Sequence, residues 1–212
     1  MAKVQPRTAV RRLPELQRHD RADLDAVLDA GRVAHLAVVD EGQPLVLPFA
    51  YVRDGDEVLL HGATASRTLR QLATGAPTCA TVTLDDGLVV ARSAAESSLH
   101  YRSAMVLGAC HVAADPLDAL RRLTEGLLPG RWAEVRPTTR KELAATLVLV
   151  LPIEEWSVKV SDGDPEDPPE DQALDIWAGV LPLEHRTGAP IPAADLRPGI
   201  EVPASVRHLT SR

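Results

Sequence analysis

The chain has 212 residues, of which 45% are hydrophobic and 3% aromatic, and its formal net charge is −7 at pH 7. These values fit one folded domain with a core of Val, Leu and Ala, and they exclude a disordered protein. The acidic balance argues against nucleic-acid binding, which needs a basic face. The start of the chain lacks a signal-peptide pattern and no apolar run is long enough to cross a membrane. We therefore expect a cytoplasmic protein with no membrane partner.

The first half of the chain predicts one helix followed by β-hairpins. The helix is expected over residues 21–30, between Asp20 as N-cap and Gly31 at its end. From Val33 the pattern changes to β-branched and leucine-rich runs, separated by turns that contain Asp and Gly. Strands are therefore expected over residues 33–39, 44–52, 57–61, 78–84 and 88–92, with a short helix over 65–74 and a hairpin turn over 85–87.

The second half predicts more helix but ends its folded part in strands. A long strand is expected over 102–113, and Asp115 with Pro116 starts a helix that ends near residue 128. A second helical piece over 139–144 leads into strands over 147–151 and 156–160. Cys79 and Cys110 lie in strand-like runs, so we expect two free, buried thiols and neither a disulfide nor a metal site.

The last fifty residues differ in composition from the rest. Residues 161–212 contain eight of the seventeen prolines, and 162–175 contain seven acidic residues and no basic one. Residues 174–180 are apolar enough to dock back onto the body, and the stretch from Pro198 is expected to be loosely ordered. The chain is therefore divided into a domain over residues 1–160 and an acidic, proline-rich extension over 161–212.

The predicted elements define the fold class. Six to seven strands joined by hairpins form an antiparallel, mainly β (α+β) structure, a small barrel or sandwich with covering helices. The alternating βαβ units and the G-x-G-x-x-G motif of a Rossmann domain are absent from the sequence.

A possible anion site lies where the predicted strand over 57–61 meets the following helix. Thr64 and Ser66 supply hydroxyl groups, Arg67 supplies a guanidinium, and the helix start supplies unpaired N–H groups, which together suit a phosphate. A Ser or Thr at this position is also an ordinary helix N-cap that needs no ligand. Both interpretations stay open.

His61 ends the strand just before this turn. A histidine there can donate a hydrogen bond to a bound molecule or relay a proton, and it can equally be a structural residue bonded to backbone. His100 and Tyr101 precede a strand and can face the same cleft, whereas His35 and His111 lie within apolar strands and are expected to be structural.

Five segments carry a family resemblance by their order and spacing, namely residues 42–51, 60–69, 98–103 with Gly108, 130–132 and 177–182. Together they resemble the pyridoxamine 5′-phosphate oxidase-like, FMN-binding split-barrel proteins, and especially the nitroimidazole-resistance branch. The resemblance implies a six- to seven-stranded antiparallel split β-barrel. It also implies a homodimer with FMN at the subunit interface.

In this family the flavin ring lies against a strand and the phosphate against a turn and a basic residue. By resemblance, the ring would contact Leu47, Pro48, Phe49 and Ala50, with His61 beside its reactive face. The phosphate would be held by Thr64, Ser66 and Arg67 together with Arg92 or Arg102. Contacts are further expected from Leu60, Gly62, Tyr101 and Ser103, and, from the partner subunit, Trp156 and Lys159.

The sequence departs from true pyridoxamine-phosphate oxidases. Thr68 stands where those enzymes have a basic residue, and their arginine-rich C-terminal signature is missing, so we do not expect that reaction. The predicted function is an FMN-dependent oxidoreductase that passes electrons to a small oxidised compound such as a nitroaromatic. The alternatives are a non-catalytic flavin-binding or sensing module, or a split barrel that uses haem, with His61 or His100 as axial ligand, or deazaflavin F420.

Overall fold

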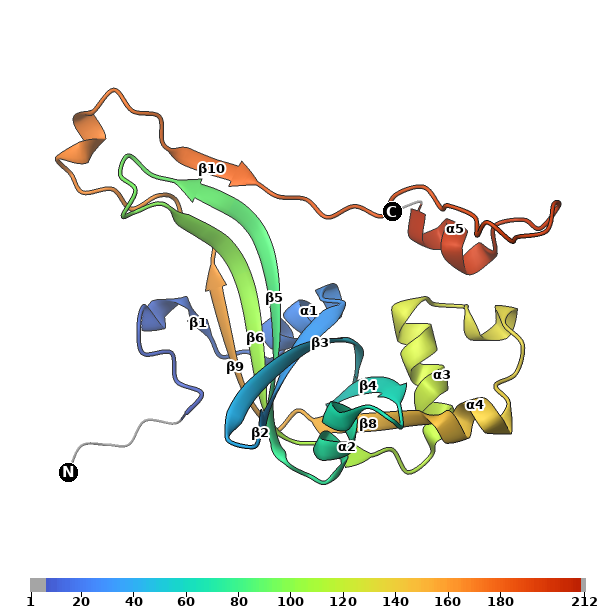
Figure 1. Cartoon of the computed structure of the whole chain (residues 1–212). Coiled ribbons are helices and arrows are strands. Elements are labelled where there is room, and N and C mark those ends of the chain that lie inside the picture. Colours follow the sequence, from blue (N-terminus) through green and yellow to red (C-terminus); the bar gives the residue numbers. More distant parts are fainter. Residues whose placement is uncertain (1–6, 211–212) are drawn as a thin grey trace.

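The computed structural model describes residues 7–210 (Figure 1). Parts of the predicted domain and of the predicted extension fall on residues 1–6 and 211–212, which lie outside the described residues. Among those described, the helices are α1 (Arg21–Ala30), α2 (Arg67–Ala73), α3 (Pro116–Leu127), α4 (Arg140–Ala145) and α5 (Ala204–Thr210). Short 3₁₀ turns are η1 (Pro14–Leu16), η2 (Trp132–Glu134) and η3 (Asp171–Ala173).

The strands form one antiparallel sheet in the order β1-β9-β6-β5-β2-β3-β4-β8-β7, with β10 paired to β5. Because β1 and β7 lie at opposite ends of this order, the sheet does not close. The mainly β, split-barrel fold is thus confirmed. The strands are β1 (Gln17–Arg18), β2 (Val33–Asp40), β3 (Gln43–Asp54), β4 (Glu57–Ala63), β5 (Pro77–Val90), β6 (Ser98–Ala109), β7 (His111–Val112), β8 (Thr146–Pro152), β9 (Glu155–Ser161) and β10 (Gly179–Pro182).

The hairpin turn predicted over residues 85–87 was wrong. Those residues lie within β5, where the pairing with β6 shifts register between Asp85 and Gly87. Because β6 pairs with β5 on both sides of this point, the turn-forming residues are accommodated as a β-bulge in one long strand.

The inner face of the curved sheet holds the main core. Leu24, Val27 and Leu28 of α1 pack there against inward side chains of the strands, and Tyr51 donates a hydrogen bond from its hydroxyl to the carbonyl of Leu28. A second, smaller core lies under α3, between that helix and the outer face of β4 and β8. The two cores account for both faces of β4, which explains why Val58, Leu59 and Leu60 are all buried.

The helix boundaries follow local capping chemistry. Asp115 caps α3 by accepting hydrogen bonds from the N–H groups of Leu117 and Asp118, both at 3.1 Å. Thr139 and Glu142 form a reciprocal capping box at the start of α4. These two helices begin where the sequence predicted. Both cysteines are free, and burial raises the pKa of the Cys110 thiol to about 12, so this sulfur stays protonated.

The C-terminal segment leaves the sheet and returns to the body. After β10 the chain runs without regular structure to α5, which lies beside α3 (Figure 1). Ser205 of α5 is buried and donates from its backbone N–H to Glu134 at 3.1 Å. The loose end predicted from Pro198 was therefore wrong for residues 204–210, because Glu134 holds the first turn of α5. Among residues 7–210, no helix is long and apolar enough to span a membrane.

Candidate functional site

The outer surface of β2 and β3 is apolar and uncovered. Along β2, the inward residues Ala34, Leu36 and Val38 are buried, while the residues between them point outward. The antiparallel register places the outward residues of β2 beside those of β3, for example Val33 beside Ala50 and His35 beside Pro48. We call this exposed set the bare face; it comprises Val33, His35, Val39, Pro44, Val46, Pro48 and Ala50.

The bare face is extensive for an exposed surface. Val39 and Val46 are 63% and 61% exposed, although large aliphatic side chains favour burial. Contiguous apolar patches on a protein surface mark binding sites for partners or ligands. The geometry of β2 and β3 therefore defines a surface suited to a flat apolar group or to another protein.

His61 lies at the border between this bare face and the part of the sheet that α3 covers. It is paired with Val148 of β8, and Val148 belongs to the small core under α3. On its other side the register of β3 and β4 ends at Tyr51 and Leu60, so the next residues along these strands are Ala50 and His61. The sheet thus brings His61 close to Pro48 and Ala50.

The His61 side chain is exposed, yet the protein atoms around its ring lower its pKa by excluding water. The imidazole is therefore neutral at pH 7. Within the described part of the chain, its ring nitrogens have no hydrogen-bond partner. A neutral imidazole with a free nitrogen can accept a proton, donate one from the other nitrogen or bind a metal ion.

The turn after His61 is built largely by its own hydrogen bonds. Thr64 donates from its N–H to Ala145 at 3.0 Å, and Ser66 donates to Ala63 at 2.9 Å. The Ser66 hydroxyl accepts from the N–H of Leu69 at 3.3 Å, so Ser66 acts as the N-cap of α2. The Thr64 side chain is exposed and free to bind a ligand. Of the two interpretations of this turn, the capping one describes Ser66.

Arg67 is tied to the turn between β2 and β3. Its guanidinium lies 2.5 Å from Asp40 and 3.6 Å from Glu41, and its side chain is 66% exposed. A phosphate at Arg67 would have to compete with these two carboxylates. The arginine is therefore placed at the edge of the bare face, but its charge is already partly neutralised.

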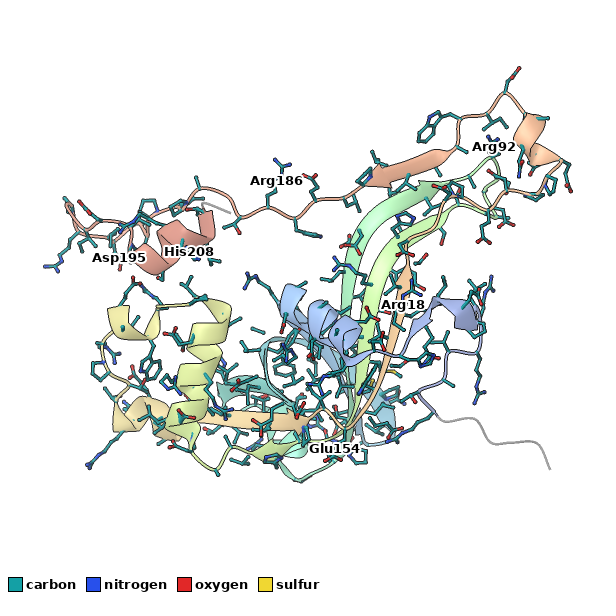
Figure 2. The ribbon with its side chains drawn as sticks, turned by 180° about the vertical axis from the view of Figure 1, so that it is seen from behind. Arg18, Arg92, Glu154, Arg186, Asp195 and His208 are labelled. Carbon is teal, nitrogen blue, oxygen red and sulfur yellow. The ribbon has the colours of Figure 1, made fainter. Side chains whose placement is uncertain are left out.

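The structure does not bring the two other candidate arginines to this turn. Arg92 lies at the far end of the β5–β6 hairpin (Figure 2), where its N–H groups bind the buried carboxylate of Asp167 at 2.7 and 2.8 Å. Arg102 makes a bidentate pair with Asp86 at 2.7 and 2.8 Å, which lowers the pKa of that carboxyl. Within one chain, neither can share an anion with Arg67.

The remaining candidates divide between the two faces of the sheet. Leu60 is buried, and Leu47 and Phe49 are half-buried with inward side chains, so these three can offer only backbone atoms to the bare face. Trp156 also packs against the inner core. Tyr101, Ser103 and Lys159 form a separate group on β6 and β9, with the Lys159 ammonium 6.0 Å from the Tyr101 ring centre.

Sequence reasoning missed several features of this surface. His35 and His111 were expected to be structural, but both side chains are exposed, and His35 belongs to the bare face. Strict alternation of buried and exposed residues over 33–36 carried that signal. The ion pair of Arg67 with Asp40 gave no signal, because it joins residues from two separate turns.

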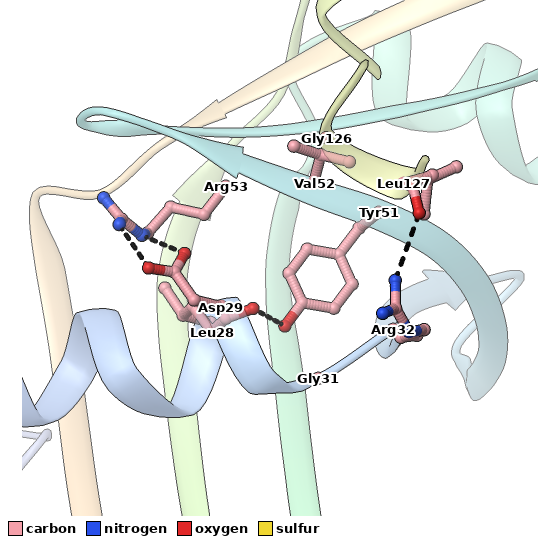
Figure 3. Close-up of a pocket in the computed structure, with 9 residues that line it drawn as sticks. All are labelled: Leu28, Asp29, Gly31, Arg32, Tyr51, Val52, Arg53, Gly126 and Leu127. Atoms are coloured by element: carbon pink, nitrogen blue, oxygen red, sulfur yellow. Dashed lines mark hydrogen bonds and ion pairs between the residues drawn. The ribbon is translucent and has the colours of Figure 1, made fainter. Parts of the chain in front are cut away.

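A cavity of about 260 Å³ lies elsewhere (Figure 3). It is bounded by the ends of α1 and α3 and by β3, where Arg53 pairs with Asp29 and Arg32 donates to the carbonyl of Leu127 at 3.3 Å. Burial raises the pKa of Tyr51, so its hydroxyl stays protonated as a donor. These polar groups are paired or hydrogen-bonded within the protein, so we interpret this cavity as part of the structural contact between α1, α3 and β3. Among residues 7–210, no group of three or more His, Cys, Asp or Glu side chains is arranged to hold a metal ion.

The antiparallel sheet does not close, α1 packs against its inner face, and the bare face is uncovered. Together these features define a split-barrel protein. The family model for pyridoxamine 5′-phosphate oxidase matches residues 20–160. The chain belongs to this family, which confirms the resemblance found in the sequence.

Two solved structures are similar along nearly the whole chain. The FAD and haem binding protein from Mycobacterium smegmatis is 48% identical with a TM-score of 0.90, and the match covers 92% of this chain and 97% of that one. The flavocytochrome Anf3 from Azotobacter vinelandii is 38% identical with a TM-score of 0.91, covering 97% of each chain.

A third similarity concerns the fold alone. A putative 5-nitroimidazole antibiotic resistance protein from Bacteroides thetaiotaomicron is 18% identical with a TM-score of 0.58, and the match covers 68% of this chain and 86% of that one. No curated protein matches the sequence.

Proposed function

We propose that this protein binds a flavin and a haem and passes electrons between them and a small-molecule partner. The observation that carries this proposal is the similarity, over 92% and 97% of the chain, to a FAD and haem binding protein and to a flavocytochrome. At 48% and 38% identity over such lengths, the surroundings of the site are expected to be alike. When bound, the flavin supplies two-electron chemistry and the haem iron supplies one-electron chemistry.

The residues of the bare face fit a flavin. Pro48 and Ala50 offer an apolar surface for a ring, with His61 beside them. The Thr64 hydroxyl and the Arg67 guanidinium are both exposed at the adjoining turn, where they would hold a phosphate. The sequence predicted FMN; the name of the Mycobacterium smegmatis protein favours FAD, so FAD is the flavin proposed here.

His61 also fits the requirements of a haem ligand. A histidine binds iron only through an unprotonated ring nitrogen, and the lowered pKa of His61 favours its neutral ring at pH 7. His100, the other candidate, is held on the β5–β6 hairpin by a 2.7 Å contact between its Nε2 and the carbonyl of Gly163. We therefore propose His61 as the ligand, and His100 as the residue to test beside it.

We further propose that two copies of the chain complete each site. The bare face covers only one side of a bound ring, and Tyr101, Lys159 and Arg102 lie too far along the sheet to close it from within the same chain. A second copy would supply the missing side, as the family resemblance implies.

The absorption spectrum of the purified protein tests the proposal. We expect a flavin band and a Soret band together, with the mass of the released flavin separating FAD from FMN. His61→Ala should abolish the Soret band, whereas His100→Ala, the matched control, should keep it. A protein with no chromophore that also fails to bind added FAD, FMN or haemin at micromolar concentration would contradict the proposal.

Reduction of a nitroaromatic stays a prediction of the sequence, because the nitroimidazole-resistance protein shares only the fold. It is tested by reducing the bound flavin and adding a nitroaromatic without oxygen. Rapid reoxidation of the flavin would support a reductase. Reoxidation no faster than without the nitroaromatic would favour a sensing or storage module.

A further inference from the structure

Residues 183–203, between β10 and α5, form a segment that we call the arch. One end is fixed by β10, which pairs with β5 from Gly179 beside Val90 to Pro182 beside Gly87, and by the Leu183 N–H, which donates to Asp86 at 3.0 Å. The other end is fixed by Ser205 on Glu134. Figure 1 shows the arch running from the β5–β6 hairpin to α5 above the body of the molecule.

The arch is anchored at both ends, and between them His185 lies 3.1 Å from the Asp85 carboxylate of β5. Every residue from 181 to 202 is nevertheless exposed. Arg186, which pairs with Glu184 of the same segment, and Asp195 both extend from the arch (Figure 2). Its apolar residues are exposed as well, and Ile191 reaches 92%. The others are Leu183, Leu196, Ile200 and Val202.

Cavities lie between the arch and the body at both ends. One, of about 400 Å³, separates residues 183–186 from Ala30, Leu84 and Arg102. The other, of about 700 Å³, lies between residues 190–203 and the η2 residues next to α3. Both clefts are open to solvent, so the arch does not close onto its own body, and its exposed apolar residues are the kind of surface that marks a binding site for a partner.

The arch cannot cover the bare face of its own chain. The cavity at its first end is lined by Ala30 of α1 and by Leu84, which packs against the inner core. The cavity at its second end is lined by Arg131 and Glu134 near η2, and no residue of the bare face lines either cavity. One chain thus carries two uncovered apolar surfaces, the arch and the bare face.

We infer that the arch of one copy lies across the bare face of a second copy and so closes the cofactor site of its partner. Two such surfaces on one chain are what a two-fold dimer requires, since each copy gives its arch and receives the other. The length of the exposed run is comparable to the roughly 20–30 residues that each side contributes to a stable interface. This inference rests on the proposed dimer and names the segment that completes each site.

Two kinds of variant test the inference by mass. Ile191→Asp with Ile200→Asp places charges on the apolar residues of the arch, and Thr187→Asp is the matched control on a polar arch residue. Sedimentation should give twice the chain mass for the native protein and the control. The double variant should dissociate, with a dissociation constant raised roughly ten-fold or more. A native protein with the mass of one chain, or a double variant that dimerises normally, would overturn the inference.

A cross-link tests which surface the arch touches. In a Cys79→Ser background, Ile191→Cys chains are mixed with Val46→Cys chains that carry a longer tag, and a short bismaleimide is added. We expect a product of mixed size, and much less of it when Val46→Cys is replaced by Glu154→Cys, which is exposed in the connection between β8 and β9. Equal yields from the two pairs would overturn the placement of the arch.

The same samples separate this inference from the proposed function. A dimer linked through residues 191 and 46 that binds no flavin or haem contradicts the proposed function and leaves the arch contact in place. A protein that binds flavin and haem but has the mass of one chain contradicts the arch contact and leaves the proposed flavin and haem binding in place. Mass and spectrum together therefore assign any failure to one proposal.

Discussion

The two outer regions of the sheet have similar side chains and opposite surroundings. On β4 and β8, Leu59, Val148 and Val150 are buried under α3. On β2 and β3, Val33, Val39 and Val46 have no cover. Sequence pattern alone does not distinguish the two regions, because both present apolar residues outward. The difference shows that this fold covers one region with its own helix and leaves the other uncovered.

The largest expected effect is a loss of folding stability in the part of the sheet that α3 covers. Leu59 is fully buried between the sheet and α3, so Leu59→Ala should lower the free energy of unfolding by about 2–5 kcal/mol through lost burial and a cavity. Urea denaturation of dilute, cofactor-free protein measures this loss. Val46→Ala on the bare face is the control and should change it by only about 0.5 kcal/mol. Similar losses of unfolding free energy in Leu59→Ala and Val46→Ala would contradict the proposed difference between the covered and the uncovered region.

The next effect concerns ligand binding at the bare region. Arg67→Ala should weaken flavin binding by about 1.5–3 kcal/mol, the size of a hydrogen bond to a charged group. Asp40→Asn should strengthen binding, because it releases the guanidinium from its present partner. Fluorescence titration with FAD measures both. Unchanged affinity in both variants would mean that the phosphate lies away from α2.

A smaller effect distinguishes a cap from a ligand at the turn. Ser66→Ala should destabilise the protein by about 1 kcal/mol, because the N–H of Leu69 loses its acceptor. Thr64→Ala should leave stability unchanged and weaken flavin binding instead, since the Thr64 side chain is exposed. Thermal unfolding without flavin, followed by titration, separates the two roles. The reverse pattern would exchange their assignments.

The smallest expected effect is a dependence on pH. The pKa of His61 is lowered in the folded state, so the unfolded chain binds more protons once the pH falls below the ordinary histidine value of about 6.5. Stability contributed by the neutral ring is present above that value and is lost as the pH falls toward the folded pKa. The difference between the urea midpoints at pH 7.5 and at pH 5.5 should be smaller in His61→Gln than in the native protein. The same difference in the variant and the native protein would contradict this expectation.

The sequence predicted much of this structure because many of its signals are local. The caps of α3 and α4 depend on Asp115 and Thr139 and on residues within three positions of them. The β2–β3–β4 hairpins follow from alternation and from their turn residues. His61 and Arg67 were placed near each other because only five residues separate them.

Features set by distant contacts could not be predicted in this way. The partners of Arg92 and Arg102 are Asp167 and Asp86, and nothing near either arginine in sequence indicates which carboxylate it meets. The order of α5 depends on Glu134, seventy-one residues from Ser205. The bulge in β5 depends on β6 continuing to pair beyond Asp85. In each case the tertiary structure, and not the local sequence, decides the outcome.

The anchoring of the arch by β10 and by Ser205 has a consequence for how the chain can change in length. Once both ends of a loop are held, doubling the number of residues between them costs only about 0.6 kcal/mol in closure entropy. Insertions and deletions within residues 187–200 should therefore leave the barrel intact. This segment is where a designer could add a binding sequence or a reporter peptide without rebuilding the fold.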